Sequence, residues 1–215
     1  MPALYVFDAY GTLFDVHAAV NRHAGKIGPD AARFSQVWRA KQLEYSWVLG
    51  LCGRYEPFWR LTERALDYAF ESFPAVDPSL RASLLDAYRA LDAYPEAPAA
   101  LERLRAGGAM TAVLSNGDAA MLNDAVTSAG LGPLLDAALS VEEAGVFKTH
   151  PRAYALVTER FGVNAGEIAF VSSNRWDVAG AAAFGFAAIW LNRAGAPDEY
   201  RDLAPRRVIA TLQEL

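Results

Sequence analysis

Residues 3–15, which read ALYVFDAYGTLFD, decide the fold class. The run from Ala3 to Phe7 is apolar and rich in side chains that favour strands, and it stops at Asp8 and Gly11. Unbroken apolar runs of this length are typical of strands that are buried on both faces, as they are in parallel sheets. We therefore predict that the chain opens with a buried strand of an α/β sheet and that Asp8 lies at the end of this strand.

Four similar apolar runs follow later in the chain, and helical patterns separate them. We expect the strands at residues 110–114, 137–141, 168–171 and 187–191, and the helices at residues 98–106, 119–129, 151–161 and 178–184. Strands that alternate with helices of this length indicate βαβ units and a parallel sheet. The sequence therefore predicts an α/β fold with a Rossmann-like parallel sheet core.

Residues 15–93 interrupt this alternation. Apolar and aromatic positions recur there at three- and four-residue spacing, which predicts helices at residues 16–24, 31–51, 57–73 and 78–91. Open α/β sheets bind ligands at the carboxyl ends of their strands, and an inserted helical segment after the first strand is well placed to cover that edge. We therefore expect a core at residues 1–14 and 94–215 and a helical cap at residues 15–93.

Composition excludes several classes of protein. The chain has 215 residues, of which 53% are hydrophobic and 21% charged, and this is enough apolar material for a globular core. A net charge of −5 does not suit nucleic-acid binding, which needs clustered Lys and Arg. The uncharged run at residues 178–192 falls short of the roughly 20 residues of a membrane span, and Asp8 stands where a signal peptide would be apolar. A single cysteine excludes a disulfide framework within the chain, so we expect a cytoplasmic protein.

Polar side chains follow the first three core strands of the predicted sheet. Asp8 is a carboxylate that would be ionised at neutral pH and can act as a nucleophile, although a helix N-cap would also suit it. Ser115 and Asn116 follow the second core strand, where a hydroxyl and free backbone N–H groups bind anions. Lys148 follows the third core strand and, as a cation, would hold Asp8 ionised.

The fourth core strand ends in residues 172–177, which read SSNRWD and supply two hydroxyls, an amide and a carboxylate. Taken singly, Ser115 and Asn116 would also suit a capped turn, Lys148 a solvated loop, and the serines of the fourth segment the polar groups at strand and helix ends. Because the carboxyl ends of parallel strands meet at one edge of a sheet, four consecutive ends of this kind together predict a functional site there.

These motifs resemble those of the haloacid dehalogenase superfamily in order and spacing. Two positions depart from the phosphatases of that superfamily: Tyr10 stands in place of a second aspartate, and Ser173 in place of a carboxylate that helps to bind Mg²⁺. Residues 8–15, 38–45 and 172–177 resemble the L-2-haloacid dehalogenase branch in particular. Within that branch, glutamine is familiar where this chain has Ala40, and proline is common where it has Thr149.

The resemblance implies hydrolysis of (S)-2-haloalkanoic acids to (R)-2-hydroxyalkanoic acids, with neither a metal ion nor another cofactor. Asp8 would attack the carbon that bears the halogen, invert it and form an ester, which water then hydrolyses. The catalytic residues that the resemblance implies are Asp8, Lys148, Asp177, Arg39, Asn174, Thr12 and Ser172. The substrate-binding residues that it implies are Ala9, Tyr10, Arg39, Phe58, Ser115, Asn116, Tyr154 and Trp176. It also implies a homodimer, which the many aromatic residues of the cap favour.

Two other functions fit parts of the sequence. A Mg²⁺-dependent phosphatase or phosphonate hydrolase of the same fold would need a metal ion and, for the phosphonate branch, a cap lysine such as Lys26 or Lys41. A domain that binds carboxylates without catalysis would keep the fold, because fold does not dictate function.

Overall fold

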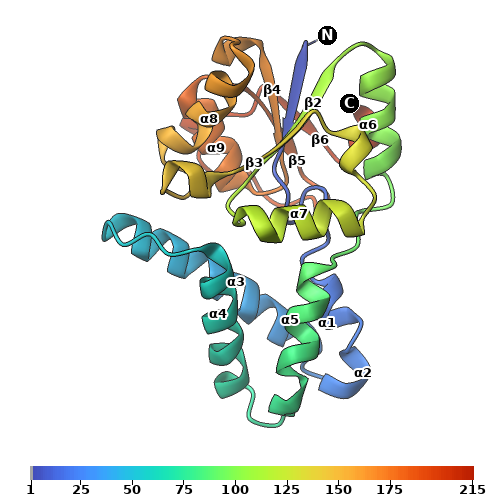
Figure 1. Ribbon diagram of the computed structural model, residues 1–215, viewed down its shortest axis with the longest axis vertical. Helices are drawn as coiled ribbons and strands as arrows, with labels where there is room; N and C mark the ends of the chain where they lie inside the picture. Colours follow the sequence, from blue (N-terminus) through green and yellow to red (C-terminus); the bar gives the residue numbers. More distant parts are fainter. Residues whose placement is uncertain (1) are drawn as a thin grey trace.

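The computed structural model describes residues 2–215 and contains one parallel sheet of six strands in the order β3-β2-β1-β4-β5-β6 (Figure 1). The strands are β1 (Leu4–Phe7), β2 (Met110–Ser115), β3 (Ala137–Ser140), β4 (Ile168–Ser172), β5 (Ala187–Leu191) and β6 (Arg207–Ile209). Every neighbouring pair is parallel, so the prediction of a parallel α/β sheet is confirmed.

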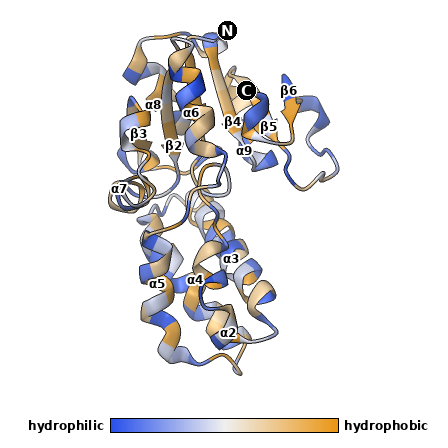
Figure 2. Ribbon diagram, turned by 90° about the vertical axis from the view of Figure 1, so that its right-hand side faces the viewer, coloured by the Kyte–Doolittle hydropathy of each residue, from blue (hydrophilic) through white to orange (hydrophobic). Residues whose placement is uncertain are grey.

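The strand β1 lies in the middle of the sheet and is wholly buried. Its last residue, Phe7, is in register with Val113 of β2 and Val171 of β4. Asp8 therefore leaves the sheet at the same level as the ends of both neighbours. Figure 2 shows the apolar colouring concentrated on these strands, between flanking helices that carry polar residues on their outer sides.

Four longer helices flank the sheet: α6 (Ala97–Ala106), α7 (Ala119–Ser128), α8 (Pro151–Phe161) and α9 (Arg175–Phe184). Each follows or precedes a strand in the manner of a βαβ unit, and α9 packs on both β4 and β5. The helix α9 begins three residues earlier than the predicted helix at 178–184. Asp177, which the sequence placed in a loop, therefore lies in the first turn of α9, with its backbone N–H donating to the carbonyl of Asn174 at 3.0 Å.

The remaining helices form a lobe beyond the carboxyl edge of the sheet (Figure 1). They are α1 (Ala18–Asn21), α2 (Ala24–Ile27), α3 (Ala31–Leu51), α4 (Phe58–Ser72) and α5 (Arg81–Arg89), with a short 3₁₀ turn at Pro78–Leu80. The predicted helix at 16–24 is wrong in detail, because the chain turns at Arg22 and His23 and forms two short helices instead of one. We call these residues, 15–93, the helical lobe.

Two linkers join the helical lobe to the sheet, and they lie side by side. Phe14 forms an antiparallel bridge with Ala93. The backbone N–H of Tyr94 donates to the carbonyl of Leu13 at 2.8 Å, and that of Asp15 donates to the carbonyl of Asp92 at 2.9 Å. The chain therefore enters and leaves the helical lobe at one place.

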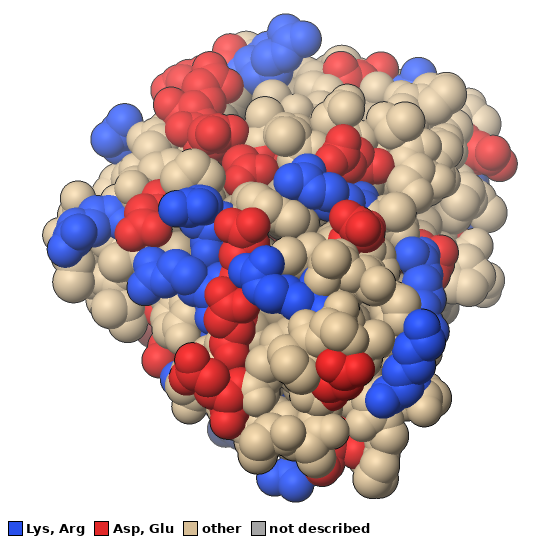
Figure 3. Space-filling view, turned by 60° about the horizontal axis from the view of Figure 1, so that its bottom comes forward, with Lys and Arg blue, Asp and Glu red and all other residues tan. Residues whose placement is uncertain are grey.

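The strand β6 was not predicted. Arg207 and Val208 are exposed at the edge of the sheet, so this strand carries no apolar run that a sequence pattern would reveal. Among the described residues, no helix combines the length and the apolar character needed to cross a membrane. Figure 3 shows Lys and Arg side chains interspersed with Asp and Glu on the face that includes the helical lobe. Within the lobe, Arg81 forms an ion pair with Asp67, and Lys41 forms one with Glu44.

Candidate active site

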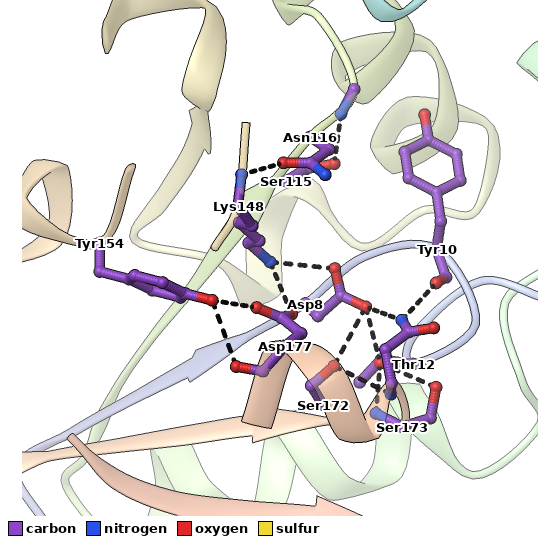
Figure 4. Close-up of polar contacts among 12 residues, drawn as sticks. Asp8, Tyr10, Thr12, Ser115, Asn116, Lys148, Tyr154, Ser172, Ser173 and Asp177 are labelled. Atoms are coloured by element: carbon purple, nitrogen blue, oxygen red, sulfur yellow. Dashed lines mark hydrogen bonds and ion pairs between the residues drawn. The ribbon is translucent and has the colours of Figure 1, made fainter. Parts of the chain in front are cut away.

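Asp8 receives hydrogen bonds on both carboxylate oxygens and is 5% exposed (Figure 4). Its Oδ1 accepts from the Nζ of Lys148 at 3.1 Å. Its Oδ2 accepts from three neutral donors, which are Asn174 Nδ2 at 2.8 Å, Thr12 Oγ1 at 3.0 Å and Ser172 Oγ at 3.4 Å. The two oxygens therefore differ: one faces a cation and the other faces a cluster of uncharged N–H and O–H groups.

Lys148 joins two buried carboxylates. Its side chain is fully buried, and its Nζ donates to Asp177 Oδ2 at 2.9 Å as well as to Asp8. Burial by itself would lower the pKa of Lys148, but the charges of Asp177 and Asp8 outweigh it and raise the pKa above its usual value. Lys148 is therefore protonated in the resting site at neutral pH.

Asp177 is also fully buried. Its second oxygen, Oδ1, accepts a hydrogen bond from the hydroxyl of Tyr154 at 2.8 Å. Burial raises the pKa of Asp177 to about 6, against the opposing effect of Lys148. A carboxylate with this pKa is a candidate base near neutral pH.

The loop after β2 brings further donors to the same edge. Asn116 uses its Oδ1 to accept the backbone N–H of Lys148 at 2.9 Å, and its Nδ2 is buried without a partner. Ser115 Oγ accepts the backbone N–H of Gly117 at 3.0 Å. A side chain at Gly117 would meet the Tyr10 ring at 2.8 Å, so the close approach of this loop to Tyr10 requires glycine.

The helical lobe contributes Arg39 from α3. This arginine is half-buried and donates to the backbone carbonyl of Tyr10 at 3.4 Å. It has no carboxylate partner among residues 2–215, and the nearby acid on the same helix, Glu44, pairs with Lys41 at 2.8 Å. The guanidinium of Arg39 therefore keeps N–H groups for another anion.

Two cavities adjoin these residues. One, of about 430 Å³, is lined by Tyr10, Arg39, Asn174 and Trp176 together with residues after β5. The other, of about 590 Å³, is largely apolar and is lined by Lys148 and Trp176 together with the end of α3. Trp176 borders both cavities, and its ring packs edge-on against Trp47 at 5.5 Å between ring centroids.

The structure brings most of the expected site residues together. Asp8, Thr12, Lys148, Tyr154, Ser172, Asn174 and Asp177 form one hydrogen-bonded cluster, which Figure 4 draws. Ser173 supports it, because its backbone N–H donates to Thr12 Oγ1 at 2.9 Å. Ala9 is fully buried, and its carbonyl accepts three backbone N–H groups of the tight turn that follows.

Two of the expected substrate contacts lie behind the walls of the cavities. Phe58 is 1% exposed and packs on Phe147 of the loop after β3, so it lies where the helical lobe meets the sheet. Tyr154 is fully buried and donates its hydroxyl to Asp177. Asp8 likewise lines neither cavity, so this position does not decide the matter, and contact of Phe58 and Tyr154 with the substrate stays a prediction.

One residue of this region was missed. Arg193 donates to the backbone carbonyls of Gly11 and Thr12, next to the nucleophile candidate. The sequence offered one indication of its role: Arg193 lies two residues after β5, and polar residues at the ends of the other core strands also contribute to the site.

A parallel sheet with an aspartate held by a lysine at the end of β1 defines a hydrolase of the haloacid dehalogenase-like class, and residues 2–185 match the family model described as haloacid dehalogenase-like hydrolase. Proteins with similar sequences place the chain in a narrower group within this class. The chain is 47% identical to (S)-2-haloacid dehalogenase 1 of Pseudomonas sp. (strain CBS-3), covering 98% of this chain and 93% of that protein. It is 44% identical to (S)-2-haloacid dehalogenase 4A of Burkholderia cepacia, covering 98% and 91%. The chain therefore belongs to the (S)-2-haloacid dehalogenase branch of this family.

A solved structure agrees with this assignment. The L-2-haloacid dehalogenase of Xanthobacter autotrophicus with chloropropionic acid covalently bound superimposes with a TM-score of 0.88 at 37% identity. The match covers 100% of this chain and 96% of that chain.

Proposed function

We propose that this chain hydrolyses (S)-2-haloalkanoic acids to (R)-2-hydroxyalkanoic acids through an ester on Asp8, with inversion at the reacting carbon. The observation that carries the proposal is the buried contact between Asp8 and Lys148, shared with Asp177. The covalently bound chloropropionic acid in the Xanthobacter relative supports a covalent route for the branch.

In the first step, Asp8 Oδ1 forms a bond to C2 of the substrate, and the carbon–halogen bond breaks with both electrons leaving on the halide. Oδ1 is the better candidate for the nucleophile because Oδ2 already accepts from three donors. An anionic nucleophile and an anionic substrate repel each other, so the site needs nearby cations. Lys148 supplies one, and Arg39 supplies another from the helical lobe.

In the second step, water attacks the carbonyl carbon of the Asp8 ester. Negative charge then develops on Oδ2, where the donors from Asn174, Thr12 and Ser172 converge and stabilise it. The bond between that carbon and Oδ1 breaks, and Oδ1 leaves with the product. Lys148 gives a proton to this departing oxygen, and Asp177 takes the proton of the water and returns it to Lys148 across their 2.9 Å contact.

The remaining polar groups suit recognition of the substrate. Ser115 and the backbone N–H groups of Ala9 and Asn116 bind its carboxylate. Arg39, the free Nδ2 of Asn116 and the ring of Trp176 receive the halide. Tyr10 and Trp176 form an apolar wall that excludes water during displacement, and the helical lobe acts as the cap over this site.

A Mg²⁺-dependent reaction is less favoured by this geometry. The Lys148 ammonium fills the space between the Asp8 and Asp177 carboxylates, where a divalent ion would bind in a phosphatase. Of the two lysines considered for a phosphonate hydrolase, Lys41 pairs with Glu44 and Lys26 is exposed on α2. We therefore propose that the reaction needs no cofactor. We also expect the enzyme to act in the cytoplasm.

The substrate assignment is tested by incubating the protein with each enantiomer of 2-chloropropanoate in excess chelator. We expect chloride release from the (S) enantiomer alone and (R)-lactate as the organic product. If the protein instead acts on phosphoesters, loses that activity in chelator and releases no chloride, it is a metal-dependent phosphatase and this proposal is wrong.

The role of Asp8 is tested with Asp8→Asn and with isotope labelling. We expect the variant to fold and bind 2-chloropropanoate but to release no chloride. After a single turnover of the wild type in ¹⁸O water, the label should be on Asp8. Label found only in the product would indicate direct attack by water, and binding without turnover in the wild type would indicate a carboxylate-binding domain.

A further inference from the structure

Arg193 holds the turn that follows the nucleophile candidate. It lies two residues after β5, and its side chain is 22% exposed. Its Nη1 donates to the carbonyl of Gly11 at 3.0 Å, and its Nη2 donates to the carbonyl of Thr12 at 2.9 Å. One guanidinium therefore fixes two consecutive peptide groups of the segment that carries Asp8.

The same guanidinium is itself held in place. Glu96 Oε1 accepts from its Nε at 3.1 Å and from its Nη2 at 2.9 Å. The ring of Tyr94 lies against its face, with Cζ 3.8 Å from the ring centroid. Glu96 and Tyr94 belong to the returning linker of the helical lobe, so Arg193 joins this linker, the loop after β5 and the turn after β1.

This turn needs external support. Gly11 has a φ of +94°, and the carbonyl of Tyr10 before it accepts from Asn174 Nδ2 at 3.2 Å and from Arg39 at 3.4 Å. The carbonyls of residues 10–12 thus all point to side chains from other elements. Thr12, whose carbonyl Arg193 holds, donates its hydroxyl to Asp8 Oδ2. A displacement of Thr12 would therefore move a donor on which the second step depends.

We propose that Arg193 is a positioning residue for the reaction at Asp8, acting through Gly11 and Thr12. It keeps the Thr12 hydroxyl on Oδ2 and the nucleophile segment at a fixed place relative to the helical lobe. Lysine cannot replace it, because an ammonium is a point donor, whereas the planar guanidinium supplies N–H groups to two carbonyls and a carboxylate at once. This inference rests on the proposed function, because its readout is halide release.

The test compares chloride release from (S)-2-chloropropanoate by the wild type, Arg193→Ala and Arg193→Lys. We expect both variants to lose kcat by roughly 10- to 100-fold with little change in KM, since small misplacements of reacting groups cost this much. Guanidinium sulfate at non-denaturing concentration should restore part of the kcat of Arg193→Ala, and urea with sodium sulfate at the same concentrations should not. Arg81→Ala is the matched control, because Arg81 forms a similar two-bond ion pair with Asp67 on the exposed side of the lobe.

Each result decides one point. Wild-type kcat in Arg193→Ala, or a loss that guanidinium does not reverse, overturns the positioning role. Should Arg193→Ala fail to fold, Arg193→Lys carries the test, and full kcat in that variant overturns the proposal. A wild type that releases no chloride refutes the proposed function instead.

Discussion

Charge balance around Lys148 is the central residue-scale feature of this site. Two buried carboxylates share one ammonium, so the cluster formed by Asp8, Lys148 and Asp177 carries a net negative charge when both acids are ionised. Protonation of Asp177 would remove this excess, which agrees with the raised pKa of that group. In the proposed mechanism Asp177 is the base, so we expect its protonation state to set how much of the enzyme is active at a given pH.

The hydroxyl of Tyr154 tunes this equilibrium. It donates to Asp177 and stabilises the ionised form, so it lowers the pKa of Asp177 from the still higher value that burial would give. In Tyr154→Phe we expect the acid side of the kcat profile, near pH 6 in the wild type, to move up by about 1 pH unit. Steady-state kcat of both enzymes, measured from pH 5 to pH 9, locates the acid side of each profile. Tyr68→Phe, on the exposed side of α4, is the control, and superimposable profiles for Tyr154→Phe and the wild type would contradict the assignment of Asp177 as the base.

Removal of the ammonium should affect activity and stability together. In Lys148→Met the two carboxylates face each other without a cation between them, and we expect kcat to fall by roughly 10²- to 10³-fold. The pKa of Asp177 in the folded state, already raised by burial, then rises further above the unfolded value of about 3.9. The folded state binds more protons than the unfolded state in this range, so the variant loses stability as the pH rises.

Denaturant unfolding at pH 5 and pH 8 measures this effect. The deficit of Lys148→Met relative to the wild type should be larger at pH 8 and should shrink as the pH falls. An equal deficit at both values would mean that packing, and not charge, dominates the role of Lys148.

At the scale of elements, one carboxylate links two helices of different parts of the molecule. Asp118 Oδ1 accepts the N–H of Met121 in α7, and its Oδ2 accepts the N–H of Trp59 in α4. Both are free N–H groups of a first helical turn, which a side-chain oxygen normally satisfies. The sheet side and the helical lobe are therefore joined by a shared helix cap.

We expect Asp118→Ala to lower the free energy of unfolding by about 2 kcal/mol, because two caps are lost from a buried position. Asp77→Ala is the matched control, since Asp77 caps only the exposed 3₁₀ turn before α5 and should cost about half as much or less. Chemical denaturation of both variants measures the difference. Equal losses would show that the bond to Trp59 contributes nothing.

The elements themselves differ in how far the sequence predicts them. Strands β1 and β4 are apolar except for Ser172 at the end of β4, so an unbroken apolar run predicts their positions. The strand β6 is short and exposed at the edge, so only its pairing with β5 defines it. The start of α9 was misplaced because polar residues that build the site also form its first turn, and a pattern cannot separate these two roles.

At the scale of the whole molecule, the sequence predicted which strand ends meet but not which side chains reach open space. Asp8 and Lys148 lie 140 residues apart, yet their meeting follows from the parallel order of the strands. Phe58 and Tyr154 are enclosed by neighbours from other elements, and no local pattern reveals this enclosure. Arg193 was missed because two of its partners are backbone carbonyls, which leave no mark in the sequence, and the third, Glu96, lies 97 residues away.

The aromatic residues of the helical lobe bear on assembly. Their number favoured a homodimer in the sequence analysis, and two of them, Trp47 and Tyr68, are exposed. Trp47 lies with Val48 and Leu51 at the exposed end of α3, and Leu51 is 90% exposed. We keep the homodimer as a prediction and place its contact at this end of α3.

Sedimentation of the wild type and Leu51→Glu tests this prediction. We expect a dimer for the wild type and a monomer for the variant, because a charge in an apolar contact opposes association. Val208→Glu, on exposed β6, is the control and should remain dimeric. A monomeric wild type, or a dimer that withstands Leu51→Glu, would contradict the placement.

The side-by-side linkers have a consequence beyond catalysis. Because the chain departs at Phe14 and comes back at Ala93 within one backbone bridge, the five helices between them form an inserted cassette with adjacent ends. A foreign helical cassette whose ends are equally close would join the same two points without distorting the open sheet beneath it. Exchange of cassettes is thus a direct route to new substrate preferences on an unchanged nucleophile.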